Sequence, residues 1–266
     1  MTIAPAIFLG HGSPMNAIER NVHTEAWSAI AARYARPRAI LAISAHWYIR
    51  GTAVTAMPMP PTIHDFGGFP AALHAVEYPA PGDAALAARV RDLLAPLYVG
   101  LDNEWGLDHG TWSVLCHVYP QADVPIVQLA IDGTRPPRFH YEIGQRLAAL
   151  RDEGIMLVGS GNVVHNLRVL RWGDDAPAYP WAVQFNEAVR DFLSRNDHAP
   201  LIDYHLLGEP AALSVPTPDH YLPMLYIAGA RRDDDEMSVI TDGIDLGSVS
   251  MLSVSYDCRR EAQGSA

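Results

Sequence analysis

The sequence contains few of the residues on which several common classes of protein depend. Its 266 residues include two cysteines, Cys116 and Cys258, and no Cys-x-x-Cys pair. A disulfide framework, a thiolate metal site and a dithiol redox role are therefore disfavoured, and a reducing compartment fits best. The formal net charge is -11, and no cluster of basic residues follows any part of the chain. This charge pattern disfavours nucleic acid as a partner.

Long apolar runs and two common catalytic motifs are also missing. No segment approaches the ~18 uninterrupted apolar residues of a membrane span. The first apolar stretch has no basic segment before it and stops at Gly10, unlike a secretory signal. We therefore expect a cytoplasmic protein with no membrane partner. Gly159-Ser160-Gly161 lacks the complete Gly-x-Ser-x-Gly elbow, and no Gly-x-x-x-x-Gly-Lys phosphate loop occurs, which disfavours those hydrolases and nucleotide-binding proteins.

The composition is that of a folded protein, with 49% apolar and 18% charged residues. Apolar strand-like runs alternate with segments of helical spacing, which predicts a single α/β domain whose central, largely parallel or mixed sheet is flanked by helices. We assign residues 1–258 to this domain and residues 259–266 to a polar tail. The acidic run at residues 233–236 is expected to be a solvated turn. The pattern predicts strands at residues 7–9, 39–45, 54–57, 125–131, 155–159 and 251–255, and helices at 83–94, 112–119, 139–151 and 181–194.

Four histidines stand where strand-like runs end: His11, His46, His165 and His220. Ligands of α/β proteins bind beyond the carboxyl ends of parallel strands, where residues distant in sequence converge. Since imidazole is a common ligand for zinc and iron, this arrangement predicts a metal site. The alternative for each is an ordinary polar residue, and for His165 a helix cap. We give that ordinary interpretation to the histidines in polar or helical contexts: His23, His74, His117, His140, His198 and His205.

Six motifs occur in order along the chain. They are Gly10-His11-Gly12-Ser13-Pro14, Ser44-Ala45-His46-Trp47, His64-Asp65-Phe66-Gly67-Gly68-Phe69-Pro70, Asp108-His109-Gly110, Gly161-Asn162-Val163-Val164-His165-Asn166-Leu167 and Pro216-Thr217-Pro218-Asp219-His220-Tyr221-Leu222-Pro223. Together they closely resemble the class III extradiol ring-cleavage dioxygenases of the LigB type, in the 4,5-DOPA dioxygenase branch. The resemblance spans nearly the whole chain, and six ordered motifs are far more specific than one.

The resemblance implies one mononuclear divalent metal that binds both oxygens of a catechol and leaves a position for dioxygen. His11, His46 and His220 are similar to the family's metal ligands. His165 is similar to its acid/base histidine, and a fourth-ligand role for it stays open. No carboxylate joins this set, which also suits zinc. We expect Fe(II) for dioxygenase activity, with Zn(II) as the alternative metal in the isolated protein.

The same motifs supply residues for the substrate. His109 is a second catalytic candidate, able to hydrogen-bond a substrate hydroxyl, and its alternative role is a helix N-terminus. His64, Trp47, Phe66 and Tyr221 are expected to bind the catechol, although buried aromatic residues more often belong to a core.

The expected partners are a small-molecule catechol and dioxygen, and the natural catechol and oligomeric state stay open. Arg50 and Arg168 follow metal motifs and are candidate partners for a substrate carboxylate. Two other functions stay open: a zinc-dependent hydrolase on the same histidine-rich site, and a metal-binding protein without turnover.

Overall fold

A mixed eight-stranded sheet forms the centre of the computed structural model, which describes residues 3–173 and 176–258. The strand order is β4-β3-β5-β2-β6-β1-β10-β7. The inner strands β5, β2, β6 and β1 are parallel, whereas β10 pairs antiparallel with β1 and β3 pairs antiparallel with β5. The strands are β1 (Ala6–Gly10), β2 (Ala39–Ile49), β3 (Thr52–Thr55), β4 (Val99–Asp102), β5 (Ile126–Asp132), β6 (Ile155–Gly161), β7 (Asp235–Thr241) and β10 (Ser253–Cys258), and a separate hairpin joins β8 (Ile244–Asp245) to β9 (Val249–Ser250).

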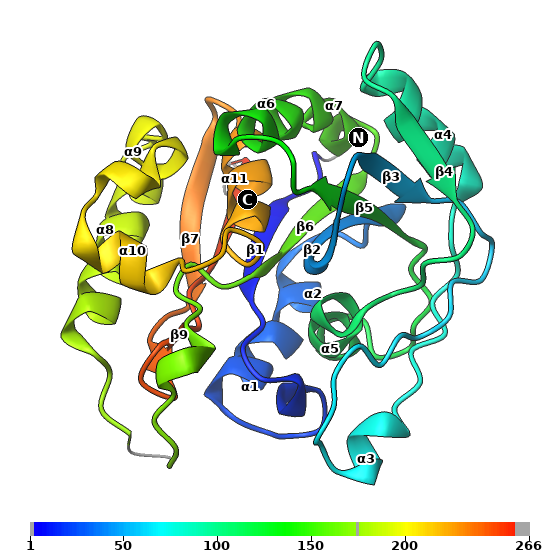
Figure 1. The fold of residues 1–266 in the computed structure, drawn as a ribbon. Coiled ribbons are helices and arrows are strands. Elements are labelled where there is room, and N and C mark those ends of the chain that lie inside the picture. Colours follow the sequence, from blue (N-terminus) through cyan, green and yellow to red (C-terminus); the bar gives the residue numbers. More distant parts are fainter. Residues whose placement is uncertain (1–2, 174–175, 259–266) are drawn as a thin grey trace, which may run out of the picture.

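Helices cover both faces of the sheet (Figure 1). One face carries α4 (Ala84–Leu93), α6 (Pro137–Leu147), α7 (Ala149–Asp152), α8 (Pro180–Ser194), α9 (Ala199–Ile202), α10 (Glu209–Ser214) and α11 (Leu222–Gly229). The other face carries α1 (Val22–Ser28), α2 (Ile30–Arg33), α3 (Ala71–His74) and α5 (His109–Val118). Short 3-10 turns are η1 (Pro14–Ala17), η2 (Leu167–Val169) and η3 (Tyr204–Leu206).

Side-chain alternation explains why the inner strands are apolar on both sides. In β1, Phe8 packs into the core beneath α11, whereas Ile7 and Leu9 pack into the core on the α5 face. Successive side chains of a strand point to opposite faces, and helices bury both faces of this sheet. The prediction of a single α/β domain with a mixed central sheet is confirmed. The expected tail, residues 259–266, lies outside the described residues.

Several sequence-based element boundaries differ from the structure. β2 continues to Ile49, so His46 lies within the strand rather than beyond its end. The segment 139–151 forms two helices, α6 and α7, and α5 begins at His109 with Asp108 as its side-chain cap. The patterns did not predict α11, because all eight of its residues are buried and a helix buried on every side has no amphipathic period.

The acidic run at residues 233–236 is not wholly a solvated turn, which corrects the expectation. Asp235 is the first residue of β7, and its carboxylate pairs with Arg151 while both side chains are fully buried. Arg151 also donates hydrogen bonds to the carbonyl oxygens of Ala4 and Ala230. Since a buried charge is tolerated only when paired and hydrogen-bonded, this pair belongs to the core.

Candidate metal centre

Close backbone packing at the carboxyl ends of β1 and β6 brings the segments that carry His11 and His220 together. Gly10 pairs with Gly161 at the last position of the parallel ladder, and His11 follows directly. A Cβ atom on Gly161 would lie 2.2 Å from the carbonyl oxygen of His220. Only glycine permits that approach, and it lets the amide of Asn162 donate to the same oxygen at 2.9 Å. The segment before α11 is thereby held against the sheet edge.

Five histidines line one cavity of about 380 Å³ at this edge. This volume falls in the usual range for small-molecule sites. His11 follows β1, His46 lies in β2 where its pairing with β5 becomes irregular, and His109 begins α5. The remaining two, His165 and His220, lie after β6 and before α11. The structure therefore brings together every residue that the sequence predicted as a metal ligand or catalytic group.

Three of these imidazoles have the Nδ1 atom hydrogen-bonded, which leaves Nε2 available to bind a metal. In a fourth, His46, Nδ1 lies 3.3 Å from a carboxylate oxygen of Asp65. Nδ1 of His11 lies 2.9 Å from the hydroxyl oxygen of Ser160, and that hydroxyl donates its own proton to the carbonyl of Gly110. Ser160 must therefore accept from His11, so Nδ1 of His11 carries the proton. Nε2 of His11 is left as an unprotonated donor atom, the form that coordinates zinc and iron.

Carboxylates fix the other three rings. Asp65 accepts hydrogen bonds from the His109 amide and ring Nδ1, both at 2.9 Å, and its second oxygen lies 3.3 Å from Nδ1 of His46. Asp219 accepts a short hydrogen bond from Nδ1 of His220. Carboxylates that bind the outer nitrogen of a metal-ligating histidine set its tautomer and orientation.

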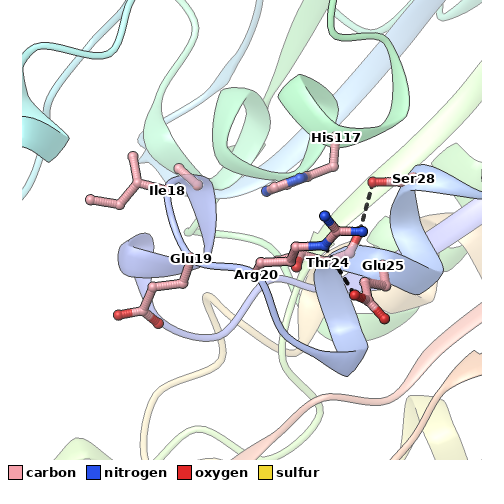
Figure 2. Close-up of a pocket in the computed structure, with 8 residues that line it drawn as sticks. Ile18, Glu19, Arg20, Thr24, Glu25, Ser28 and His117 are labelled. Atoms are coloured by element: carbon pink, nitrogen blue, oxygen red, sulfur yellow. Dashed lines mark hydrogen bonds and ion pairs between the residues drawn. The ribbon is translucent and has the colours of Figure 1, made fainter.

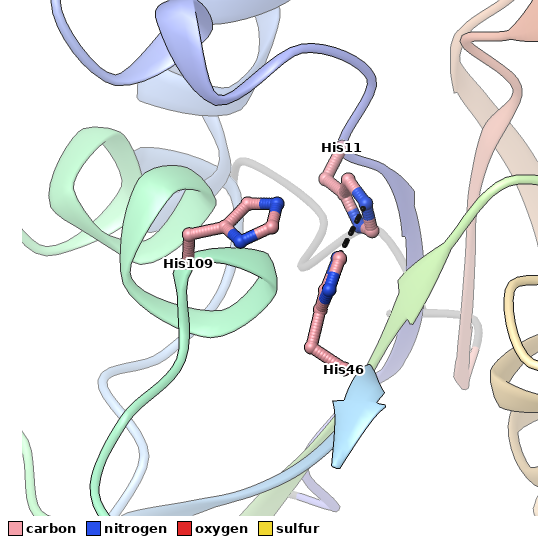
Figure 3. A group of neighbouring side chains, drawn as sticks. All are labelled: His11, His46 and His109. Atoms are coloured by element: carbon pink, nitrogen blue, oxygen red, sulfur yellow. Dashed lines mark hydrogen bonds between the residues drawn. The ribbon is translucent and has the colours of Figure 1, made fainter. Parts of the chain in front are cut away.

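The distances between the free nitrogens fit one bound ion. Nε2 of His46 lies 3.3 Å from Nε2 of His11, and Figure 3 shows the two rings facing each other with His109 beside them. Two nitrogens bound to one ion at about 2.1 Å lie about 3.0 to 3.4 Å apart. The donor atoms of His11, His46 and His109 all lie within 4.8 Å of one another. In the absence of a metal this contact is a hydrogen bond, in which one of the two nitrogens carries a proton. A shared cation would replace that proton.

His165 differs from the other four. Its ring stacks on His220 with a centroid distance of 3.5 Å and an interplanar angle of 9°. Its side-chain donor atom lies within 4.8 Å of those of His220 and Asp219. No hydrogen bond to its ring nitrogens fixes its tautomer among the described residues, so either nitrogen of His165 can exchange a proton.

Burial controls the charge of the site. Burial, followed by the neighbouring histidines, lowers the pKa of His11 and His46 well below the ordinary value. Burial and His220 lower the pKa of His165 to about 2. Burial alone would raise the pKa of Asp65, but the hydrogen bonds and charge of His109 outweigh it and hold the pKa at about 2. The histidines with resolved shifts are therefore neutral near pH 7, and Asp65 is an anion.

A fully buried carboxyl group lies behind the histidines. Asp108 accepts hydrogen bonds from Ser44 at 2.6 Å and from the side chain of Gln128. Burial raises the pKa of Asp108 to about 6. A Cβ atom on the next glycine, Gly110, would lie 2.8 Å from the ring of His46. This network holds the first turn of α5 against β2.

Three of the four predicted substrate-binding residues do not line the cavity, which corrects their assignment. Trp47 stacks on Trp105 with an interplanar angle of 3°, because adjacent residues of a strand point to opposite faces and His46 faces the site. Tyr221 is fully buried and donates to the carbonyl of Leu201. His64 contacts the carbonyl of Val76 through Nε2 at 2.9 Å. Only Phe66 of this group lines the cavity.

Most of the remaining wall is apolar and was not predicted from the sequence. Leu167, Leu170, Trp172, Leu246 and Val249 belong to the η2 region and the β8–β9 hairpin. Apart from Leu167, which ends the His165 motif, these residues stand outside the six motifs, and only the fold places the hairpin beside η2. The hydroxyl of Ser160 was likewise missed, since its role depends on the parallel pairing of β6 with β1.

A second hollow lies over η1, α1 and the end of α5 (Figure 2). Its volume is about 550 Å³, and its lining includes one histidine, His117. Nε2 of His117 contacts the carbonyl of Asn16 at 2.7 Å, and Arg20 pairs with Glu25 at 3.0 Å. This hollow offers no group of converging metal donors, so it is not a second candidate centre. No helix in the described part of the chain is both long enough and apolar enough to cross a membrane.

Known proteins resemble this chain over nearly its whole length. The family model described as the catalytic LigB subunit of aromatic ring-opening dioxygenase matches residues 5–251. A protein of Escherichia coli K12 named 4,5-DOPA dioxygenase extradiol is 55% identical, covering 95% of this chain and 94% of that protein. A protein of the same name from Beta vulgaris is 35% identical, covering 96% and 97%. The crystal structure of an uncharacterized Escherichia coli K12 protein superposes with a TM-score of 0.83 at 50% identity, covering 95% of this chain and 99% of that one.

Proposed function

The chain belongs to the LigB family of aromatic ring-opening dioxygenases, and from that premise we propose that it cleaves the ring of a catechol with dioxygen, in the extradiol manner. The observation that carries the proposal is the convergence of five imidazoles on one cavity, three of them with Nδ1 hydrogen-bonded and a fourth with Nδ1 3.3 Å from Asp65. Pre-oriented neutral nitrogen donors are what a mononuclear metal requires. The proposed partners are a small-molecule catechol, with the DOPA of the relatives' names as the first compound to test, and dioxygen.

We assign His11, His46 and His220 as the residues that hold the metal. These three residues would hold the metal and leave positions for the two catechol oxygens and for dioxygen. His109 and His165 are then free for other roles. Iron(II), when bound there, supplies the redox chemistry that dioxygen requires and that zinc lacks.

His165 is assigned the proton transfer. A catechol must lose protons to bind as a chelate, and the neutral imidazole of His165 faces the same cavity. The negative charge of the deprotonated catechol favours the protonated imidazole and so raises its basicity on binding. His165 then returns this proton during ring opening.

His109 is assigned to orient the substrate. Asp65 holds both its amide and its Nδ1, so Nε2 keeps a fixed direction in the cavity. From that position it hydrogen-bonds a hydroxyl of the catechol. A zinc-dependent hydrolase uses a similar donor set, but family membership favours the dioxygenase.

Reconstitution without oxygen tests the proposal. The metal-free protein is loaded with iron(II) or zinc, mixed with L-DOPA and with 4-methylcatechol, and then exposed to air. With iron alone, we expect oxygen uptake together with a yellow ring-opened product. A protein that binds one metal tightly but consumes no oxygen with either catechol would contradict the proposal.

A further inference from the structure

Resting on the proposed function, we propose that the site selects catechols whose ring substituent is apolar and carries no carboxylate. The argument concerns the part of the cavity beyond the histidines, where a substituent on the bound ring would lie. L-DOPA, which gives the relatives their name, has a carboxylate in its side chain. The inference therefore separates this chain's preferred substrate class from that compound.

Apolar side chains build this outer part of the cavity. They come from three separate segments: the 64–70 loop, the turn around η2 and the β8–β9 hairpin. The residues are Phe69, Leu167, Leu170, Trp172, Leu246 and Val249. A substituent placed among them gives up part of its water and gains apolar contacts, which favours alkyl and aryl groups.

No aspartate, glutamate or arginine among the described residues lines this cavity. Arg50 and Arg168, the candidates for a carboxylate clamp, are exposed and lie outside its lining. Arg171 lies in sequence between Leu170 and Trp172, which line the cavity, but its own side chain does not line it. Its guanidinium lies 3.7 Å from the ring centroid of Tyr179 and donates to the carbonyl of Pro177. A substrate carboxylate would thus give up part of its hydration without gaining a cationic partner.

A neighbouring hollow of about 560 Å³ adds to the selection against an anionic substituent. It shares Phe69, Trp172 and Leu246 with the histidine cavity, so a long substituent that passes them enters it. Its lining contains the carboxylates of Glu19 and Asp245. Its one histidine, His23, has Nε2 3.4 Å from Asp245, so any positive charge on that ring is matched by that carboxylate. These groups repel an anionic substituent.

The backbone of Leu246, at this wall, has an unusual conformation. Its φ angle is +49°, a left-handed conformation that is unusual for a leucine and that glycine or asparagine adopts at lower cost. The conformation is held by a hydrogen bond from the Arg171 amide to the Leu246 carbonyl at 2.9 Å. Such conformations persist where the surrounding structure fixes them, commonly at functional sites.

Four catechols of similar size test the proposal: 4-propylcatechol, dopamine, 3-(3,4-dihydroxyphenyl)propanoic acid and L-DOPA. Their dissociation constants are measured by calorimetry on the zinc-loaded protein without oxygen, where no turnover occurs. Values of kcat/KM follow from oxygen uptake by the iron-loaded protein. We expect 4-propylcatechol to bind at least tenfold more tightly than the propanoic acid, and dopamine more tightly than L-DOPA, with the same order in kcat/KM.

A charge introduced at the wall should reverse this order. Leu170→Arg is expected to tighten binding of the propanoic acid about tenfold and to weaken that of 4-propylcatechol. Val169→Arg is the matched control, because Val169 is the adjacent residue and does not line the cavity; it should change neither constant. If Leu170→Arg does not fold, Leu167→Arg serves in its place, since Leu167 lines the cavity and is 56% exposed.

The outcomes separate this inference from the proposed function. Cleavage of all four catechols with no penalty for the carboxylate would overturn the inference and leave the proposed function standing. If none of the four were bound or cleaved, both would fall. An unchanged order of affinity in Leu170→Arg, or in Leu167→Arg where that variant replaces it, would also overturn the inference, because the outer wall would then not contact the substituent.

Discussion

One isolated buried histidine and a cluster of histidines at the sheet edge show that burial of an imidazole does not by itself make a functional site. His140 lies on α6, fully buried, and contacts the hydroxyl of Tyr226 on α11 at 2.9 Å through Nδ1. The histidines at the sheet edge are buried or partly buried and converge on one another, with ring centroids of His46 and His109 3.8 Å apart. Burial lowers the pKa in both regions. Burial alone therefore does not define a site, whereas convergence of unprotonated nitrogens does.

The largest difference between the cluster and the isolated histidine should appear in metal content, when a side chain is removed from each. We expect His46→Ala to lose the metal, from about one ion per chain to none, and at least about 10³-fold in activity, because a converging donor is missing. His140→Ala should keep a full complement of metal, measured by elemental analysis after gel filtration. Metal retained at full stoichiometry by His46→Ala would contradict the proposed ligand set.

Within the converging group, His165 should behave differently from the ligands. We expect His165→Ala to bind metal normally and to lose about 10² to 10⁴-fold in kcat, the usual contribution of a general acid or base. Metal content and oxygen uptake are measured on the same preparation. Normal turnover would remove the acid/base assignment, and loss of the metal would make His165 a ligand.

Asp65 tests whether the hydrogen-bonded carboxylates organise the converging histidines. Asp65→Asn keeps the size of the side chain but removes the charge that faces His46 and His109, so we expect metal affinity to fall about 10 to 100-fold. Competition with a chelator measures that affinity. Asp123→Asn is the control, since Asp123 pairs with Arg36 on the surface. Equal affinity in both variants would show that Asp65 does not support the metal site.

The smallest expected effect concerns the isolated histidine. Burial lowers the pKa of His140 to about 4, so the unfolded chain binds the proton more readily than the folded protein as the pH falls below about 6.5. Stability is therefore lost between pH 6.5 and about 4, and the contribution of His140 should reach about 1 kcal/mol at pH 5.5. In metal-free protein, His140→Gln should reduce this slope in urea unfolding. An unchanged slope would show that His140 does not contribute to it.

Much of the fold could be predicted from the sequence. The apolar runs of β1, β2, β5 and β6 are strong because both faces of each strand are buried. β4 and β7 were missed, since they are edge strands with mixed burial. α11 was missed for the opposite reason, because its complete burial removes any polar face.

The sequence by itself placed five imidazoles in ordered motifs, and all five line the cavity: His11, His46, His109, His165 and His220. Only the tertiary structure decided what surrounds them. Strand alternation turns Trp47 away from the cavity, and parallel pairing of β1 with β6 brings Ser160 to His11. Leu246 reaches the outer wall through a hairpin about 80 residues beyond His165. A motif shows which residue types lie next to one another in sequence. The hydrogen-bond partners of the histidines and the walls of the cavity depend on contacts between segments distant along the chain.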